Sequence, residues 1–107
     1  MTWIRIARTD QLQDDEVIPF EHGDKRVALF RSGGQYFVTD NVCTHQFALL
    51  SDGFAEDGCI ECPLHEARFD IRTGKALCGP ATESLNVYPV RVEDSDVLVD
   101  LEHASVE

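Results

Sequence analysis

Two short segments that each combine a cysteine with a histidine constrain this chain more than any other feature. The first reads Cys43-Thr44-His45, and the second, after residues 46–61, reads Cys62-Pro63-Leu64-His65. In the first segment the two side chains are two residues apart, so in extended backbone they leave the same face. In the second segment Pro63 stiffens the chain and removes one amide donor, which suits a tight loop. Each segment therefore offers one thiol and one imidazole to a shared metal centre.

Two kinds of metal centre use two cysteines and two histidines. A [2Fe–2S] cluster takes this set when two histidines replace two cysteines on one iron. Cys43 and Cys62 would then ligate one iron, and His45 and His65 the other. A structural zinc site also accepts two cysteines and two histidines, but such sites usually pair like residues within each arm. The mixed arms favour the iron–sulfur cluster and leave zinc as the alternative.

Length and charge limit what the chain does. Its 107 residues suffice for one domain, and no apolar run approaches the roughly 20 residues that a membrane helix needs. The N-terminal residues lack the layout of a signal peptide, so we expect a cytoplasmic location. The formal charge of −11 argues against nucleic acid and anionic membranes as partners. The acidity serves solubility, or steers the chain towards a basic face on a redox partner.

The rest of the chain predicts an all-β fold. Extended runs alternate with turns that contain glycine or adjacent polar residues, and no long amphipathic helix is present. Pro19 confines its strand to a sheet edge, because proline has no amide hydrogen to donate. Helical turns are predicted only near residues 10–13 and 47–51. The predicted strands cover residues 3–7, 17–20, 25–31, 36–39, 55–61, 67–71, 85–92 (interrupted at Pro89) and 97–99.

We expect a single domain, residues 1–107, with two parts. Residues from about 1–40 and 82–107 carry the regular strand pattern and form a basal sheet part. Residues 41–81 are dense in glycine, cysteine, histidine and proline, and form an inserted metal-binding subdomain. Within it, residues 55–61 are predicted as one strand leading into the second ligand loop, and residues 67–71 as one leading out. A hairpin turn is predicted at residues 73–75.

The remaining cysteines and histidines have no comparable context. Cys59 and Cys78 lack a histidine neighbour, so we expect small, buried or half-buried apolar side chains. We expect His22 and His103 to be ordinary residues. No cysteine is singled out as an activated nucleophile, so no catalytic residue is predicted.

Together these motifs resemble those of the Rieske [2Fe–2S] proteins. The likeness begins with the two cysteine–histidine segments and extends over nearly the whole chain. It is strongest to the small Rieske ferredoxins of bacterial aromatic-ring-hydroxylating dioxygenase systems. The other matching segments are Asp52-Gly53, Ala67-Arg68-Phe69-Asp70, Thr73-Gly74, Gly79-Pro80-Ala81 and the run from Leu85 to Tyr88-Pro89-Val90.

The resemblance implies a Rieske fold and one [2Fe–2S] cluster held by Cys43, His45, Cys62 and His65. It implies an electron carrier without catalysis of its own, which we expect to be a monomer. In those systems a flavoprotein reductase takes electrons from NAD(P)H, and the ferredoxin passes them singly to a terminal oxygenase. A third loop containing Pro80 would cover the cluster. A small Rieske subunit of an assimilatory nitrite reductase is the alternative with the same fold.

Two departures from related families bear on the redox potential. Rieske proteins of respiratory cytochrome complexes resemble this motif but carry an extra cysteine in each ligand loop, where Ala48 and Leu64 stand here. No such disulfide can therefore form. Those proteins also place serine and tyrosine hydroxyls near the cluster, where Ala67 and Phe69 stand. Hydrogen bonds to sulfur raise the potential, so their absence predicts a value near the low end of the Rieske range, roughly −150 mV.

Overall fold

The computed structural model describes residues 2–43, 48–63, 67–78 and 84–104, which form three antiparallel β-sheets. The described residues contain strands and two short 3-10 helices, η1 (Thr9–Gln11) and η2 (Leu50–Asp52), and the predicted all-β fold is confirmed. The first sheet has the order β1 (Ile4–Arg8), β11 (Asp96–Val99), β10 (Val90–Glu93). The second has the order β2 (Glu16–His22), β3 (Lys25–Ser32), β4 (Gln35–Asp40), β9 (Val87–Tyr88). The third has the order β5 (Phe54–Glu56), β6 (Cys59–Glu61), β7 (Arg68–Asp70), β8 (Ala76–Cys78).

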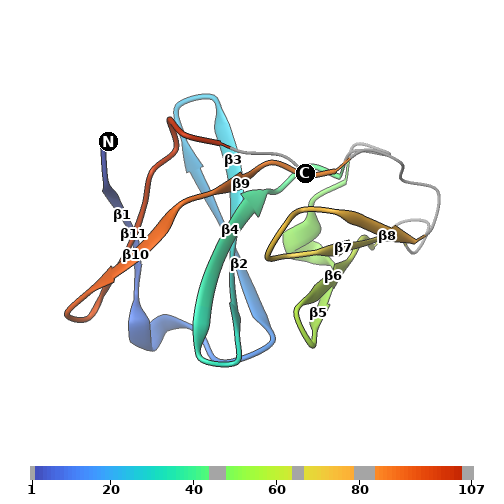
Figure 1. Ribbon diagram of the computed structural model, residues 1–107, viewed down its shortest axis with the longest axis horizontal. Helices are drawn as coiled ribbons and strands as arrows, with labels where there is room; N and C mark the ends of the chain where they lie inside the picture. The colour runs from blue at the N-terminus through green and yellow to red at the C-terminus, as the bar shows by residue number, and fades with distance from the viewer. Residues whose placement is uncertain (1, 44–47, 64–66, 79–83, 105–107) are drawn as a thin grey trace.

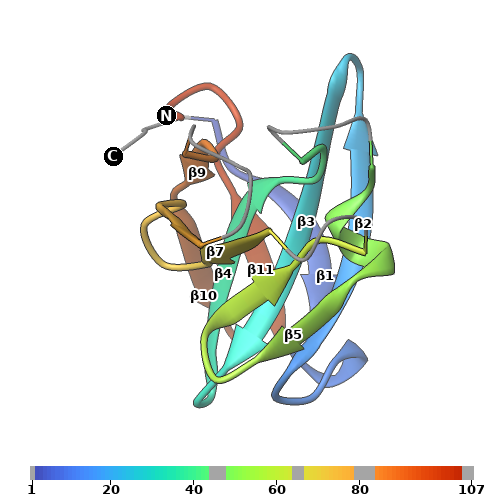
Figure 2. The ribbon, with the colours of Figure 1, turned by 90° about the vertical axis from the view of Figure 1, so that its right-hand side faces the viewer.

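The second sheet is the middle one of three layers (Figure 1). Its strand β3 has buried apolar residues on both faces. Ala28 and Phe30 pack into a hydrophobic cluster with residues of the third sheet, which Figure 2 shows in front of the second. Val27 and Leu29 pack into a second cluster with residues of the first sheet. Burial on both faces explains why this strand is a continuous apolar run rather than an alternating one.

Two prolines have the positions that their chemistry requires. Pro19 lies in β2, which is an edge strand of the second sheet as predicted. Pro89 separates β9 from β10, and the predicted interruption is confirmed. At this proline the chain passes from one sheet to another, because β9 pairs with β4 of the second sheet and β10 pairs with β11 of the first. Pro89 therefore joins two layers.

The prediction of one strand over residues 55–61 is wrong. The segment forms a hairpin, in which β5 and β6 are joined by the turn Asp57-Gly58. Both turn residues have positive φ, 51° and 80°, as a two-residue hairpin turn requires, and Asp-Gly is a strong signal for such a turn. The strands on either side have only three residues each, too few to show a periodicity.

The structure confirms one further predicted strand and two predicted helical turns. The strand at residues 67–71 is confirmed as β7, and a turn that includes Thr73 joins it to β8. The two predicted helical turns correspond to η1 and η2, although η2 begins only at Leu50 and residue 47 lies outside the described residues. No helix in the described ranges is both long and apolar enough to span a membrane.

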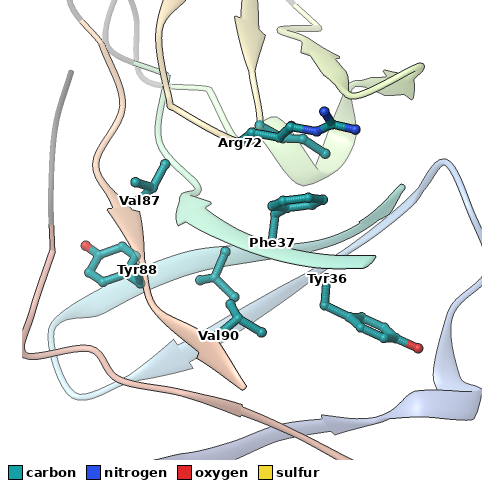
Figure 3. Close-up of a pocket in the computed structure, with 8 residues that line it drawn as sticks. Tyr36, Phe37, Arg72, Val87, Tyr88 and Val90 are labelled. Atoms are coloured by element: carbon teal, nitrogen blue, oxygen red, sulfur yellow. The ribbon is translucent and has the colours of Figure 1, made fainter. Parts of the chain in front are cut away.

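A pocket lies between strands β4, β9 and β10 and the turn that follows β7 (Figure 3). The guanidinium carbon of Arg72 is 5.8 Å from the centre of the Phe37 ring, so the arginine covers one side of it. No cysteine is among the described residues that line it. The lining residues are Tyr36, Phe37, Val38, Ile71, Arg72, Val87, Tyr88 and Val90.

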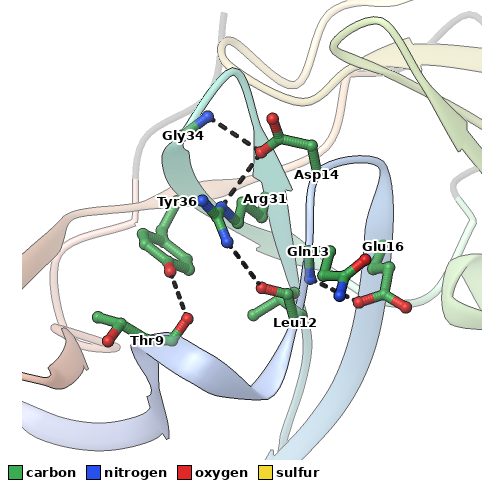
Figure 4. Close-up of polar contacts among 8 residues, drawn as sticks. All are labelled: Thr9, Leu12, Gln13, Asp14, Glu16, Arg31, Gly34 and Tyr36. Carbon is green, nitrogen blue, oxygen red and sulfur yellow. Dashed lines mark hydrogen bonds and ion pairs between the residues drawn. The ribbon is translucent and has the colours of Figure 1, made fainter.

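Polar contacts fasten the connection between β1 and β2 to the β3–β4 hairpin (Figure 4). The Arg31 guanidinium donates to the Leu12 carbonyl at 3.1 Å and pairs with the Asp14 carboxylate at 3.1 Å. The same carboxylate accepts the Gly34 amide at 3.0 Å. The Tyr36 hydroxyl donates to the carbonyl of the first residue of η1 at 2.8 Å. These contacts hold that connection against the hairpin.

Asp100 is a fully buried carboxylate just after β11. Its side chain accepts hydrogen bonds from the Glu102 amide at 2.9 Å and from Nδ1 of His103 at 2.7 Å. Burial alone would raise the pKa of Asp100, but these hydrogen bonds and the charge of His103 hold that pKa below its ordinary value. The charged carboxylate is therefore the form that the fold favours.

We expect Asp100 to make the fold less stable in acid. Because its folded pKa lies below its unfolded pKa, its stabilising contribution is complete above the unfolded value of about 3.9 and is lost as the pH falls through the folded value. The apparent Tm should therefore fall more steeply below about pH 4 in the wild type than in Asp100→Asn, which has no carboxylate to protonate. Circular dichroism melts across an acid series measure both slopes, and equal slopes would contradict this role.

Candidate metal centre

The segments that carry the two predicted ligand cysteines are closed by the same backbone hydrogen bond. The Cys43 amide donates to the Ala48 carbonyl at 2.9 Å, and the Cys62 amide donates to the Ala67 carbonyl at 2.7 Å. Each cysteine therefore opens a loop that ends at an alanine five positions later. Beside the first loop Val42 pairs with Leu49, and beside the second β6 pairs with β7. The two cysteines thus lie at matching positions in these two backbone contacts.

Both cysteines are buried in one hydrophobic cluster. Cys43 is 4% exposed and Cys62 is 2% exposed, and the cluster that holds them also contains Leu50, Ile60 and Phe69. The irons of [2Fe–2S] clusters are held by cysteine thiolates, and burial shields such a centre from water. Two sulfur donors in one dry, apolar environment therefore fit one iron of such a cluster.

The histidine half of the predicted ligand set lies outside the described residues. His45 and His65 belong to the ranges 44–47 and 64–66, and Pro80 of the predicted covering loop belongs to 79–83. Within the described ranges no group of three or more histidine, cysteine or acidic side chains gathers as a metal site. The four-residue ligand set therefore stays a prediction. Cys59 is half-buried on β6, as expected for it.

The two positions that lack hydroxyl groups are part of the apolar surroundings. Ala67 and Phe69 are both fully buried in the cluster that contains Cys43 and Cys62. Neither side chain has a group that donates a hydrogen bond to sulfur. The low reduction potential expected on this ground stays a prediction.

Sequence reasoning missed the residue pair Asp40-Asn41, which leads from β4 into the first cysteine loop. The Asp40 carboxylate accepts hydrogen bonds from the Tyr88 hydroxyl at 2.5 Å and from the Asn86 side chain at 2.9 Å. Burial raises the pKa of Tyr88, and the hydrogen bond to Asp40 and its charge raise it further, so Tyr88 stays a neutral donor. The available signal was two polar residues between a buried strand and a ligand motif.

Two glycines mark close approaches between the backbone segments around the site. A Cβ atom at Gly53 would overlap the carbonyl oxygen of Glu61, the residue directly before Cys62. A Cβ atom at Gly74 would overlap the carbonyl oxygen of Leu85. The first contact joins the exit of the first cysteine loop to the entry of the second. The second contact joins the β7–β8 turn to the segment that leads into β9.

Comparison with known proteins identifies the family. The model of the Rieske [2Fe–2S] domain matches residues 2–89. The ferredoxin component of the naphthalene 1,2-dioxygenase/salicylate 5-hydroxylase systems of a Ralstonia species is 44% identical over 100 residues, which are 94% of this chain and 96% of that protein.

Solved structures agree with this comparison. The complex of reduced oxygenase and oxidized ferredoxin in carbazole 1,9a-dioxygenase contains a chain with a TM-score of 0.92 and 30% identity, with 98% of this chain and 97% of that chain covered. The Sphingomonas yanoikuyae B1 ferredoxin has a TM-score of 0.88 and 36% identity, with 92% and 98% covered. Two structures described as putative nitrite reductase small subunits are 22% and 26% identical. The chain belongs to the Rieske [2Fe–2S] domain family, and its cofactor is a Rieske-type [2Fe–2S] cluster.

Proposed function

We propose that this protein is the electron-transfer ferredoxin of an aromatic-ring-hydroxylating dioxygenase system. It carries single electrons from a flavoprotein NAD(P)H reductase to a terminal oxygenase. The observation that carries the proposal is the 44% identity, over nearly the full length of both chains, to a protein named as a ferredoxin component of such systems. The carrier has no substrate chemistry of its own, and it works in the cytoplasm as a monomer.

The proposed ligands are the two cysteines and two histidines of the sequence motif. Cys43 and Cys62, which are both buried, would hold one iron, and His45 and His65 would hold the other. When bound, the cluster supplies one-electron oxidation and reduction. Neutral imidazoles in place of thiolates leave it less negative, so accepting an electron costs less than in an all-cysteine cluster. Residues 41–81 form the cluster-binding part, and residues 1–40 and 82–107 support it.

The charge of the chain suits an interaction between proteins. A formal charge of −11 steers the ferredoxin towards basic docking faces and speeds the encounter at low ionic strength. Fast encounter and release serve a carrier that must visit a reductase and an oxygenase in turn. A zinc module that serves only as an interaction domain would not need to alternate between two partners. Membership of the Rieske family also argues against a zinc module.

The nitrite reductase alternative has weaker support. It would keep the fold and the cluster and change only the partner. The solved small subunits of that class share 22% and 26% of their residues with this chain, against 44% for the Ralstonia ferredoxin component. The partner must therefore be tested directly.

The deciding experiment has two stages. Iron and sulfide analysis, with electron paramagnetic resonance (EPR) of the dithionite-reduced protein, should show about two irons per chain and a rhombic signal of a histidine-ligated cluster. The protein is then reduced by NADH through a dioxygenase reductase and mixed with the oxidised oxygenase and an aromatic substrate. Re-oxidation in this mixture supports the proposal. Re-oxidation only by a nitrite reductase with nitrite would overturn the dioxygenase assignment and keep electron transfer.

A further inference from the structure

We propose that Asn41 is a positioning residue that fixes the first cysteine loop relative to the second. The inference rests on the proposed ligands, because it concerns how Cys43 and Cys62 are brought to one cluster. Asn41 lies two residues before Cys43 and is only 3% exposed. A buried amide side chain is costly unless its polar atoms are hydrogen-bonded. The partners of Asn41 therefore indicate what it holds in place.

Asn41 joins the entry of the first loop to its exit and to strand β3. Its backbone amide donates to the Arg26 carbonyl on β3 at 2.9 Å, and its backbone carbonyl accepts the Leu50 amide at 2.7 Å. Its side-chain Oδ1 accepts the Ser51 amide at 2.8 Å, and its Nδ2 donates to the Ser51 hydroxyl at 3.0 Å. Asn41, at the entry of the first loop, thus holds η2, at its exit. Its bond to Arg26 ties the entry and η2 to the middle sheet.

The helix η2 in turn contacts the entry to the second loop. The Gly53 amide donates to the Leu50 carbonyl at 2.9 Å, which continues the turn. The Gly53 backbone lies so close to the Glu61 carbonyl that no Cβ atom fits between them. Glu61 is bonded directly to Cys62. An unbroken series of contacts therefore runs from Asn41 through η2 and Gly53 to the second ligand cysteine.

The contacts of the neighbouring residue, Asp40, allow an effect of Asn41 on the cysteine loops to be separated from an effect on the fold as a whole. Asp40 is held from the other direction by Asn86 and Tyr88. Loss of the Asn41 side chain would therefore leave the end of β4 anchored and would remove the two side-chain hydrogen bonds to η2, while the backbone bond from Leu50 remains. The expected consequence is a looser relation between Cys43 and Cys62 in an otherwise folded protein. Residues that bond directly to metal ligands and orient them typically change metal affinity about 10-fold to 100-fold when they are replaced, so we expect an effect at the lower end of this range for Asn41.

The test compares three variants of the cluster-loaded protein. Asn41→Ala removes both side-chain hydrogen bonds to Ser51, whereas Asn41→Asp keeps an oxygen that accepts the Ser51 amide. The matched control is Thr39→Val. Thr39 is also fully buried, and its hydroxyl donates to the Asp40 carbonyl at 2.8 Å, so this change removes a nearby buried hydrogen bond that does not reach η2.

Asn41→Ala should release iron to a chelator about 10-fold faster than the wild type, with altered EPR g values and a shifted midpoint potential. Asn41→Asp should fall between the two. Thr39→Val should lower the apparent Tm and keep the wild-type spectrum and iron release. If Asn41→Ala does not fold, Ser51→Ala, which removes only the partner of Nδ2, should show the same spectral change in smaller measure.

The outcomes separate this inference from the proposed function. Wild-type spectrum, potential and iron release in Asn41→Ala, or in Ser51→Ala if that is the variant measured, would overturn the positioning role whatever happens to the Tm. A wild-type protein that binds no two-iron cluster would instead overturn the proposed ligands, before any variant is compared.

Discussion

Replacing Cys62 with serine is expected to remove the [2Fe–2S] cluster, whereas replacing Cys59 with serine is expected to leave it in place. The two residues are three positions apart at β6, so the same substitution is compared in nearly the same part of the fold. Cys62 is 2% exposed and packs in the hydrophobic cluster that contains Cys43. Cys59 is half-buried and is not among the residues of that cluster.

The expected difference follows from ligand chemistry. Iron in these clusters takes soft thiolate ligands, and a serine hydroxyl is a hard, protonated donor that does not replace one. Iron content should remain at about two per chain in Cys59→Ser and fall close to zero in Cys62→Ser. Cys43→Ser should behave as Cys62→Ser does. Iron and sulfide analysis with visible absorption measures the effect, and a full cluster in Cys62→Ser would refute the ligand assignment.

The sequence predicted the parts of this protein that depend on local spacing. The pairing of Cys43 and Cys62 with nearby histidines indicated the cofactor from the spacing alone. The apolar run Val27–Phe30 indicated a strand over residues 25–31, and Pro19 indicated an edge strand. In each case neighbouring residues carry the signal, because ligand spacing, burial pattern and proline chemistry act over a few positions.

What could not be predicted depends on contacts between distant segments. The hydrogen bonds between Asn41 and Ser51 and between Tyr88 and Asp40 join residues that no sequence motif or periodicity connects. The close approach of Gly53 to Glu61 is likewise invisible in either segment alone. The hairpin turn at Asp57-Gly58 is different, because its signal was present and was obscured by strands of three residues.

Gly74→Ala is expected to destabilise the protein far more than Gly34→Ala, although the two glycines have nearly the same backbone conformation. Their φ angles are 79° and 77°, so an alanine at either position pays the same left-handed penalty, roughly 1–2 kcal/mol. Nothing lies within 4 Å of a Cβ atom placed at Gly34. At Gly74 the same atom would overlap the Leu85 carbonyl. The pair therefore isolates the cost of that one contact.

The segments at Gly74 have little freedom to move apart. The Leu85 amide donates to the Gly74 carbonyl at 2.7 Å, and the Gly74 amide donates to the Asp70 carbonyl at 2.7 Å. Leu85 is fully buried in the cluster that contains Cys43 and Cys62. Relieving the overlap must therefore disturb the core around the metal centre, and overpacking of this kind typically adds about 1–3 kcal/mol.

The apparent Tm should accordingly fall by about 10 °C more in Gly74→Ala than in Gly34→Ala, since 1 kcal/mol corresponds to about 4–8 °C in a domain of this size. Circular dichroism melts at one scan rate give the comparison. Iron release to a chelator should accelerate in Gly74→Ala alone, because Leu85 belongs to the hydrophobic cluster that holds both predicted ligand cysteines. Equal losses of Tm in the two variants would mean that the Leu85 segment moves away from residue 74 without cost, and that it does not brace the core around the cluster.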